Sequence, residues 1–459
     1  MKRSTPDLSW VEPFVERIRP YVSVRLEDNV LIRMPNECFK LNPTGARLLH
    51  YMLNGGKLKK LLKIRANDAQ TPDQIHEFFT ALSLMLGANF CEQFHSPAVT
   101  RVGYTLGYIE LPVLAELAIT DRCNIRCRFC YASCQKETSD QMTEMSVKEC
   151  KQILRVIRHD AGVPSVSFTG GEPMLRPEIF DLIEYAHKSL KMRVNLITNG
   201  TLISENTARK LRKSGLASAQ VSLESPDPEI HDRLTCVKGS HRLSVNGMMA
   251  LKKAGIYVHP HSTLCAENAA SLINMADFVK TLGLDRFSMN MLIPVGRGKE
   301  EALAVRYHQV DELLKPIGES ARNAGVEFMW YAPTPVCLFN PLAHQLGNKC
   351  CAACEGLLAI DPQGNLLPCS SWKEPVGSLL KEEFKTLWFS ERAKWLRTKS
   401  AAPPECDGCV DFALCNGACP LYFNVFPEDR AFLNCQKNFV DKTEESHVIP
   451  VKNSRISIS

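Results

Sequence analysis

Cysteine is the residue type with the most chemical potential in this chain, which has 19 of them among 459 residues. They are unevenly distributed, with four between positions 123 and 134 and ten between positions 337 and 435. No secretory signal pattern is recognisable, and proteins of reducing compartments use clustered thiols for metal rather than for disulfides. The distribution therefore predicts two separate metal regions.

The first region contains Cys123, Cys127 and Cys130 with the spacing C-x3-C-x2-C, directly after a predicted strand. A loop of this size places three thiolates around an iron–sulfur cube and leaves the fourth iron without a protein ligand. An open metal position binds and activates small molecules, whereas a closed one is structural. A zinc site with Cys134 as the fourth donor is the alternative, because thiolates suit both metals.

The second region has a longer pattern. Its members are spaced Cys354-x9-Gly364-x4-Cys369 and then Cys406-x2-Cys409-x5-Cys415-x3-Cys419, with Cys435 after a gap. Paired C-x2-C motifs also occur in zinc ribbons, so zinc is the alternative here as well. The isolated cysteines, expected to be ordinary buried thiols, are Cys38, Cys91, Cys150, Cys236 and Cys265.

Alternating strand and helix patterns between about residues 112 and 300 predict the elements that position the first region. The predicted strands are Leu114–Thr120, Ser165–Thr169, Arg193–Thr198, Ala219–Leu223, Tyr257–Leu264 and Arg286–Leu292. Repeated βα units indicate a parallel sheet, and six in succession predict an α/β fold with a partial (β/α)6 TIM-like barrel. Chemistry in such folds lies at the C-terminal ends of the strands, where the cysteine triplet falls.

Two further parts flank this core, which spans residues 106–334. Residues 1–105 read as strands at 21–26, 30–34 and 37–41 followed by helices at 44–53, 57–64 and 71–86, a winged-helix order. Residues 335–441 are rich in cysteine and poor in periodicity, so the order of this part is expected to depend on metal. Residues 442–459 are predicted to form a flexible tail.

The cysteine triplet and its surroundings resemble the radical S-adenosylmethionine superfamily. The likeness includes Phe129, an aromatic residue before the third cysteine, and the segment Thr169-Gly170-Gly171-Glu172-Pro173 after the next strand. It implies that the triplet binds a [4Fe–4S] cluster, that S-adenosylmethionine binds at its open iron, and that the Gly-Gly-Glu-Pro segment binds the amino group of the cofactor. Cofactor contacts are also implied for Asn199, in a common turn dipeptide, and for Ser222. The loop 294–298 resembles the family's loop after the sixth strand, with a Gly-rich turn and a solvated arginine as the alternative.

The resemblance also implies a reaction. Reductive cleavage of S-adenosylmethionine gives a 5′-deoxyadenosyl radical, which takes a hydrogen atom from a substrate. The cofactor supplies this chemistry, and the protein positions the substrate and excludes water.

The second cysteine region resembles the SPASM extension, which binds two auxiliary [4Fe–4S] clusters and would bring the total to three. The implied ligand sets are Cys354, Cys369 and Cys419 with an upstream cysteine for the first cluster, and Cys406, Cys409, Cys415 and Cys435 for the second. The upstream ligand is left open between Cys337, Cys350 and Cys351. Cys351 is favoured, because Cys351-Ala-Ala-Cys354 forms a compact C-x2-C chelate.

The amino-terminal part resembles, over residues 24–49, the small peptide-recognition domain related to the chaperone of pyrroloquinoline quinone assembly. The resemblance implies that a precursor peptide binds as an added strand near residues 37–41, with the helix 71–86 as the other wall. SPASM members mostly modify peptides or proteins, so a peptide maturase that forms a carbon–carbon or thioether crosslink is expected. Ser370 and Cys415 stand where sulfatase-maturing and pyrroloquinoline quinone enzymes have aspartate, which disfavours those two products.

Two alternatives stay open at this point. One is a small-molecule radical decarboxylase, such as those of alternative haem synthesis, which share the architecture. The other is a non-catalytic iron–sulfur or zinc scaffold that binds peptides. No general base stands out in the sequence.

Composition sets the remaining expectations. The chain is 45% hydrophobic and 23% charged, as in ordinary globular proteins, and its net charge of +5 is too small to indicate nucleic-acid binding. No apolar stretch of about 18 residues indicates a membrane span. We therefore expect a cytoplasmic oxidoreductase that works on a precursor peptide or protein and receives electrons from a protein such as flavodoxin or ferredoxin.

Overall fold

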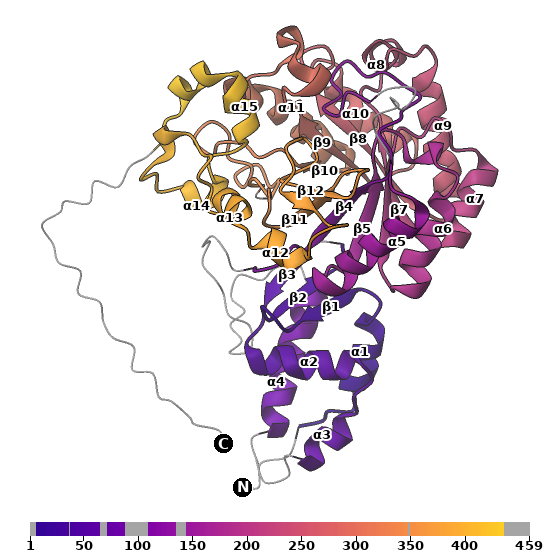
Figure 1. Ribbon diagram of the computed structural model, residues 1–459, viewed down its shortest axis with the longest axis vertical. Helices are drawn as coiled ribbons and strands as arrows, with labels where there is room; N and C mark the ends of the chain where they lie inside the picture. The colour runs from indigo at the N-terminus through magenta and orange to yellow at the C-terminus, as the bar shows by residue number, and fades with distance from the viewer. Residues whose placement is uncertain are drawn as a thin grey trace, which may run out of the picture.

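A computed structural model of the chain describes residues 6–35, 37–64, 71–87, 109–134, 144–347 and 349–435 (Figure 1). A small N-terminal domain lies at one end of a larger body that contains the long sheet. Cys91 lies outside the described residues, as do the predicted tail 442–459 and most of the approach to the first barrel strand.

The N-terminal domain combines an antiparallel sheet of order β1-β2-β3 with a set of helices. Its elements are α1 Val11–Ile18, β1 Val22–Arg25, β2 Val30–Arg33, β3 Glu37–Lys40, α2 Pro43–Leu53, α3 Leu58–Ile64 and α4 Thr71–Gly87. The Asn42 side chain accepts a hydrogen bond from the Gly45 amide and so begins α2 at Pro43. Phe14, Leu49 and Phe79 form the centre of its own apolar core. The predicted strands and helices are confirmed, and α1 is an element that the sequence patterns missed.

The central body is a sheet of parallel strands with helices on its outer face. Its strands are β4 Leu114–Ala118, β5 Ser165–Thr169, β6 Arg193–Thr198, β7 Leu216–Ser222, β8 Tyr257–Leu264 and β9 Arg286–Met291. Each strand pairs in parallel with the next. The outer helices are α5 Val147–Arg155, α6 Ile179–Glu184, α7 Glu205–Ser214, α8 Pro228–Thr235, α9 Ser240–Lys253, α10 Met275–Thr281 and α11 Val310–Ala324. The α/β fold with a partial TIM-like barrel is confirmed.

Further strands extend this sheet at both edges. β10 Glu327–Trp330 pairs in parallel with β9, and β11 Leu357–Ile360 pairs in parallel with β4. β12 Asn365–Leu367 and β13 Gly377–Ser378 continue it in antiparallel fashion beyond β11. The sheet therefore crosses the boundary expected at residue 334.

The cysteine-rich part also contributes to the main apolar core. Its short helices are α12 Phe384–Trp388, α13 Glu391–Arg397, α14 Phe412–Cys415 and α15 Pro420–Val425. Trp388, Tyr422 and Phe423 are buried in the same cluster as barrel residues such as Phe168 and Trp330. Apolar packing therefore gives this part order of its own, beyond the order expected from metal alone.

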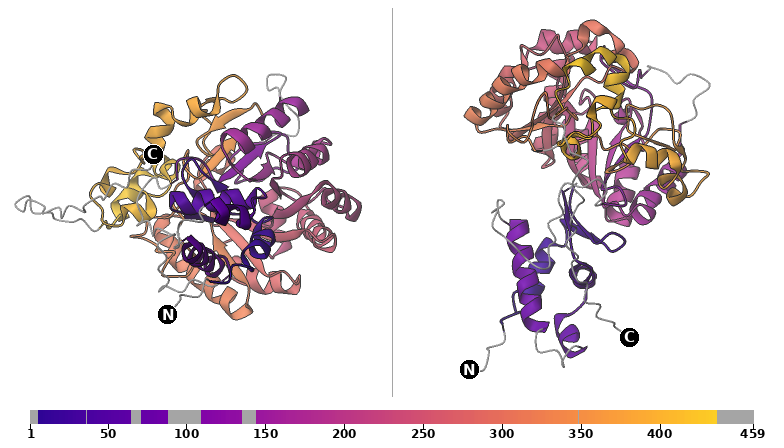
Figure 2. Two further views of the ribbon diagram at one scale, coloured as in Figure 1. Left: turned by 90° about the horizontal axis from the view of Figure 1, so that it is seen from below. Right: turned by 90° about the vertical axis from the view of Figure 1, so that its left-hand side faces the viewer.

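A buried arginine connects the N-terminal domain to the N-terminal end of the barrel strands. Arg25, only 4% exposed, forms an ion pair of 2.7 Å with Asp28. Its guanidinium also donates to the carbonyl oxygens of Leu111, Pro112 and Ala161, which immediately precede β4 and β5. Figure 2 shows the resulting arrangement, with the domain beside the strand ends rather than on a face of the barrel.

Within the described ranges, no helix is both long and apolar enough to cross a bilayer.

Candidate metal centres

The cysteine triplet lies in the loop that follows β4, at the C-terminal edge of the sheet. Cys123 and Cys134 are buried in one small cluster, and Cys127 and Cys130 pack against them. The start of the loop is in register with the neighbouring strand, because the Ile119 amide donates to the Thr169 carbonyl at 3.0 Å. The structure therefore brings the three predicted thiols together at the predicted edge.

The loop is held on its far side by residues that are distant in sequence. The amides of Arg126 and Arg128 donate to the carbonyls of Thr235 and Leu234 at the end of α8. Arg297 donates from Nε to the Cys127 carbonyl and from Nη1 to the Cys134 carbonyl, both at 2.9 Å. The arginine in the loop 294–298 is thus only partly exposed, and its hydrogen bonds stabilise the conformation of the cysteine loop.

Two glycines let the turn after β5 lie directly against the beginning of the cysteine loop. Gly170 has φ +140°, and a Cβ there would collide with the Thr120 carbonyl oxygen. A Cβ on Gly171 would collide with the Arg122 carbonyl oxygen. The close approach is used by two hydrogen bonds, from the Gly171 amide to Thr120 at 2.8 Å and from the Glu172 amide to Arg122 at 2.7 Å. This backbone cradle requires glycine.

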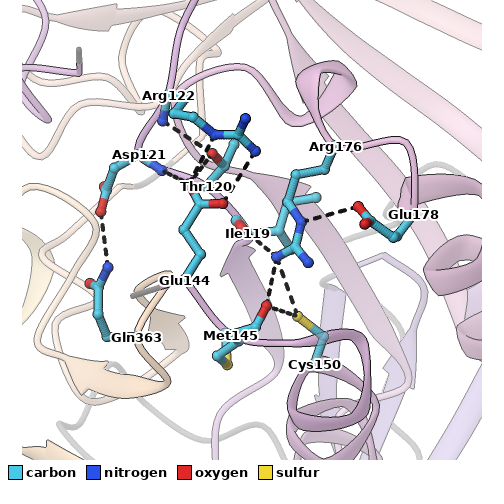
Figure 3. A network of polar contacts seen from close by, with 10 residues as sticks. All are labelled: Ile119, Thr120, Asp121, Arg122, Glu144, Met145, Cys150, Arg176, Glu178 and Gln363. Atoms are coloured by element: carbon cyan, nitrogen blue, oxygen red, sulfur yellow. Dashed lines mark hydrogen bonds and ion pairs between the residues drawn. The ribbon is translucent and has the colours of Figure 1, made fainter. Parts of the chain in front are cut away.

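A polar network on the other side of the cysteine loop fixes it to the barrel and to the cysteine-rich part (Figure 3). Arg176 is 6% exposed and donates to the carbonyls of Ile119 and Met145, both at 2.9 Å. Glu144 accepts hydrogen bonds from the Thr120 hydroxyl and from the Arg122 guanidinium. Figure 3 also shows the Gln363 amide reaching the Asp121 carboxylate, at 3.2 Å.

Glu172 is fully buried, and protein groups surround its carboxylate. It accepts hydrogen bonds from the Met174 amide at 3.0 Å, the Thr198 hydroxyl at 2.7 Å and the Asn199 amide at 2.8 Å. Burial raises the pKa of Glu172 to about 7. The carboxylate therefore links the Gly-Gly-Glu-Pro turn to the end of β6.

The hydrogen bond from its amide to Glu172 holds Asn199 beside the cysteine triplet, where the residue is 6% exposed. Its amide nitrogen lies 2.9 Å from the Asn124 side-chain oxygen and 3.9 Å from the Cys123 sulfur. Its own oxygen accepts from the Thr201 amide at 2.9 Å. The residue thus forms the turn and also contacts a cysteine of the triplet.

Phe129 and Ser222 occupy the two other positions predicted for the cofactor. Phe129 packs against the apolar cluster that contains Leu234 and Leu292. Ser222 ends β7, at the same edge of the sheet as the triplet. Their roles toward a cofactor stay predictions.

Cys134 lies against the triplet. Its thiol hydrogen-bonds to the Cys130 sulfur, and this contact lowers the pKa of Cys130. The fourth donor of the zinc alternative is therefore present beside the triplet. Its contact is with Cys130 itself, which also makes it a candidate hydrogen-bond donor to a metal-bound thiolate.

The cysteine-rich part contains two groups of thiols. In the first group, the charges of Cys351 and Cys419 raise the pKa of Cys369. The charge of Cys351 also raises the pKa of Cys354. Burial is the main cause that raises the pKa of Cys354 and of Cys419 to about 12. Cys351 thus lies with the cysteines predicted for the first auxiliary cluster, and Cys350 is its direct neighbour.

The second group contains the four cysteines predicted for the other auxiliary cluster and one more. The sulfurs of Cys406 and Cys435 are 4.0 Å apart, and Cys409 and Cys415 are their neighbours. The charge of Cys337 also acts on Cys406 and Cys435, so this cysteine is a further neighbour of the group. Across the described ranges, no three His, Cys, Asp or Glu side chains stand close enough together for a single metal ion.

Glu116 is a functional candidate that the sequence analysis missed. Its neighbours in β4, Ala115 and Leu117, are fully buried in the outer apolar core, so its own side chain faces the barrel interior. The Ser370 hydroxyl, directly after Cys369, donates to its carboxylate. Glu116 keeps partial exposure, although burial raises the pKa of its carboxyl, as expected for a side chain that borders an enclosed space. Only the three-dimensional contact with Ser370, 254 positions away, identifies it.

One expectation about the isolated cysteines is wrong. Cys236 is exposed, because it ends α8 in a left-handed conformation with φ +58° at the surface. Cys150 and Cys265 are buried as predicted, and Cys38 is partly buried.

The structure combines a cysteine triplet and a glycine cradle at the C-terminal edge of the barrel strands with two further groups of thiols. This combination is typical of a class of proteins that bind several metal centres through thiolates. Sequence comparison names the class. The radical SAM superfamily pattern matches residues 117–279, and the SPASM iron–sulfur cluster-binding domain matches residues 350–410. The chain belongs to the radical SAM superfamily and carries a SPASM domain. It is an enzyme whose cofactors are S-adenosylmethionine and [4Fe–4S] clusters.

Individual relatives are distant and of more than one kind. An AdoMet-dependent heme synthase of Oleidesulfovibrio alaskensis is 25% identical over 315 residues, 65% of this chain and 80% of that protein. The subtilosin biosynthesis protein AlbA of Bacillus subtilis is 24% identical over 405 residues, 82% of this chain and 86% of that protein. Streptococcus suis SuiB, solved with its precursor peptide SuiA, has a similar fold, with a TM-score of 0.67 and 18% identity over 88% of this chain and 95% of that chain.

The residues present fit these cofactors. Thiols are the donors that iron–sulfur clusters require, and they lie in three separate groups in the described structure. Gly170 and Gly171 let the turn after β5 lie directly against the backbone at the beginning of the cysteine loop.

Proposed function

We propose that this enzyme modifies a peptide or protein substrate, with the triplet as the site of S-adenosylmethionine cleavage. In this proposal, Cys123, Cys127 and Cys130 bind the catalytic cluster. The bound cofactors supply a 5′-deoxyadenosyl radical. The chain's own residues shape the site: Gly170 and Gly171 provide the cradle, and Arg297 fixes the cysteine loop.

The auxiliary ligands follow from the two groups of thiols. The first group is Cys351, Cys354, Cys369 and Cys419, and the second contains Cys406, Cys409, Cys415 and Cys435. The proximity of Cys351 to Cys369 and Cys419 supports it as the upstream ligand. Cys134 acts in this proposal as a hydrogen-bond donor to Cys130 rather than as a metal ligand.

The N-terminal domain is the observation that favours a peptide over a small molecule. Its sheet ends in β3, which pairs with β2 on one side and has Glu37 exposed at its start. An edge strand presents backbone donors and acceptors to which an extended peptide can be added. The AlbA match supports this choice, because it spans 82% of the chain, whereas the heme synthase match spans 65%.

Glu116 is the group that we assign to proton transfer. Its carboxylate borders the barrel interior between β4 and the segment after Cys369, with Ser370 as its hydrogen-bond donor. A carboxylate whose pKa is raised by burial is a stronger base than an exposed one. Formation of a crosslink removes two hydrogens from the substrate. One would leave as a hydrogen atom taken by the 5′-deoxyadenosyl radical, and the other as a proton that Glu116 would receive together with an electron that an auxiliary cluster would accept.

The first test is anaerobic reconstitution with iron and sulfide, followed by reduction in the presence of S-adenosylmethionine. The expected results are 5′-deoxyadenosine formation by the wild type and none by Cys127→Ala. Cys134→Ala should bind as much iron as the wild type. If the wild type instead bound zinc and Cys134→Ala did not, the assignment would be contradicted.

The second test addresses the substrate. Co-expression with a small precursor-like peptide encoded beside the gene, followed by mass spectrometry, should show a mass change in that peptide. Deletion of residues 1–105 should abolish the peptide change and leave 5′-deoxyadenosine formation. Normal peptide turnover by the truncated protein would contradict the role of the N-terminal domain.

A small-molecule radical decarboxylase is the second candidate, because the heme synthase of Oleidesulfovibrio alaskensis is matched over 80% of its own length. Turnover of a carboxylated tetrapyrrole with release of carbon dioxide, and no change in the co-expressed peptide, would decide in its favour.

A further inference from the structure

The surface beside the cysteine triplet is formed by three segments that are far apart in sequence. The first is the part of the cysteine loop at 124–128, the second is the turn 199–203 after β6, and the third is the connection 235–243 between α8 and α9. The third segment also reaches the thiols, because Val237 packs against the small cluster around the buried Cys123. A protein that docks on these segments therefore comes close to the triplet.

Hydrogen bonds join the three segments into one surface. The Arg126 amide donates to the Thr235 carbonyl at 3.1 Å, which connects the first segment to the third. The Asn124 side chain donates to the Thr201 hydroxyl at 2.8 Å, which connects the first to the second. The second and third meet where the Ser244 hydroxyl, directly after the third segment, donates to the Asn199 carbonyl at 2.7 Å.

This surface is basic. Its three segments contain no aspartate or glutamate, and their basic residues are Arg126, Arg128, Lys238 and Arg242. Arg128 forms ion pairs with two glutamates from other segments. Arg126, Lys238 and Arg242 are exposed, and none of them has an acidic partner among the described residues. Three uncompensated cations on one surface attract an acidic partner and guide its approach.

The same surface has an exposed apolar part. Leu202 is 40% exposed on the second segment, and Leu243 is 41% exposed on the third. Apolar side chains among charged ones are the usual anatomy of a protein–protein interface, and redox partners bind through small interfaces. A second copy of this chain is disfavoured as the partner, because its net charge of +5 would be repelled.

The reaction of the proposed function supplies the reason for such a partner. Cleavage of the sulfonium carbon–sulfur bond takes up one electron and yields methionine and a 5′-deoxyadenosyl radical, so each cleavage oxidises a donor by one electron. Electron transfer between two proteins requires a short separation of their redox groups. The donor must therefore approach the enzyme next to Cys123, Cys127 and Cys130.

We propose that the surface of Arg126, Leu202, Lys238, Arg242 and Leu243 is the docking site for an acidic protein that carries one electron at a time. The carrier is oxidised by one electron, which reaches the sulfonium by way of the thiolate-bound cluster. This inference rests on the proposed function of the triplet and adds to it the place and the charge of the partner.

The test measures the rate of 5′-deoxyadenosine formation by the full-length, reconstituted enzyme with two reductants. Reduced flavodoxin is the acidic probe protein, and reduced methyl viologen is a small molecule that needs no docking site. Lys238→Glu/Arg242→Glu reverses two charges of the surface outside the cysteine loop. Lys210→Glu/Arg212→Glu is the matched control, because it makes the same charge change at exposed positions near the end of α7, toward the opposite edge of the sheet.

With flavodoxin at low ionic strength, we expect Lys238→Glu/Arg242→Glu to lower the rate by about tenfold or more and the control to keep the wild-type rate. Added salt should narrow the difference, because it screens the charges. With methyl viologen, both variants should match the wild type.

Four results would count against the docking site. The first is a wild-type rate of the surface variant with flavodoxin, the second is an equal loss in the control, and the third is an equal loss with both reductants. The fourth is a variant that flavodoxin reduces normally but that modifies the co-expressed peptide more slowly, which would assign the surface to the substrate. A wild type that forms no 5′-deoxyadenosine with methyl viologen would instead refute the proposed function.

Discussion

Removal of the Arg297 side chain should loosen the cysteine loop around the catalytic cluster. The guanidinium makes two hydrogen bonds of 2.9 Å, to the carbonyls of Cys127 and Cys134. A hydrogen bond from a charged donor contributes about 1.5–3 kcal/mol, and the lower value applies because Arg297 is only partly buried. Arg297→Ala should therefore destabilise the closed conformation of the cysteine loop by about 3 kcal/mol. This corresponds to a roughly hundredfold larger population of the opened loop.

The assay is the rate of iron transfer from the reconstituted, anaerobic protein to an iron chelator. The phase that belongs to the catalytic cluster is identified as the one that S-adenosylmethionine slows. In Arg297→Ala this phase should be about a hundredfold faster, and in Arg297→Lys, which keeps the charge and loses the paired geometry, about tenfold faster.

Arg209→Ala is the matched control, because Arg209 is exposed and forms only a surface ion pair of 3.6 Å with Glu205. Its iron should leave at the wild-type rate. If Arg297→Ala also lost iron at that rate, the hydrogen bonds would contribute nothing to the loop, and the assignment of Arg297 would be refuted.

Four further predictions concern stability, cofactor binding and catalysis. Arg25→Ala should lower the free energy of unfolding by about 3 kcal/mol and raise hydrogen exchange in β1, because Asp28 and three backbone carbonyls lose a buried partner; unchanged exchange would contradict this. Gly171→Ala should weaken S-adenosylmethionine binding by at least about tenfold in equilibrium dialysis at unchanged iron content, since the new Cβ meets the Arg122 carbonyl. Burial lowers the pKa of His261 to about 3, so protons bind preferentially to the unfolded chain. The free energy of unfolding of the wild type should therefore fall as the pH drops below 6.5. His261→Gln should remove about 3 kcal/mol of that loss by pH 4.5, as measured by urea unfolding. Glu116→Gln should keep the iron content and raise the ratio of 5′-deoxyadenosine to modified peptide, and equal ratios would remove Glu116 from the proposed proton transfer.

The fold of the barrel could be predicted because its signal is local. Strands such as Arg193–Thr198 recur at regular intervals between helical patterns, and the structure has this strand with the predicted bounds. β10 and β11 were missed for a physical reason: each is only four residues long, and β11 pairs with β4, which lies far earlier in the chain. A short edge strand is specified by the neighbour on which it lies, which a sequence pattern does not contain.

The same division applies to the candidate site. Spacing predicts which cysteines belong together when they are close in sequence, as in Cys406 and Cys409. It cannot place Arg297, whose partners lie about 165 positions earlier. Glu172 was predicted from its motif, yet its hydrogen bonds to Thr198 and Asn199 show a linking role that depends on the neighbouring strand.

The peptide-binding site and the catalytic site of the proposed function lie at opposite ends of the same strands. Arg25 binds carbonyls just before β4 and β5, so the N-terminal domain lies at the N-terminal ends of these strands, whereas the cysteine triplet follows β4 at its C-terminal end. β4 has five residues, which at about 3.3 Å each separate the two ends by about 17 Å. A peptide bound at the β3 edge must bridge at least that distance to present a residue at the triplet, which takes five or more extended residues at about 3.3–3.6 Å each. The substrate therefore needs a recognition segment and a separate modified segment, joined by a spacer of at least this length.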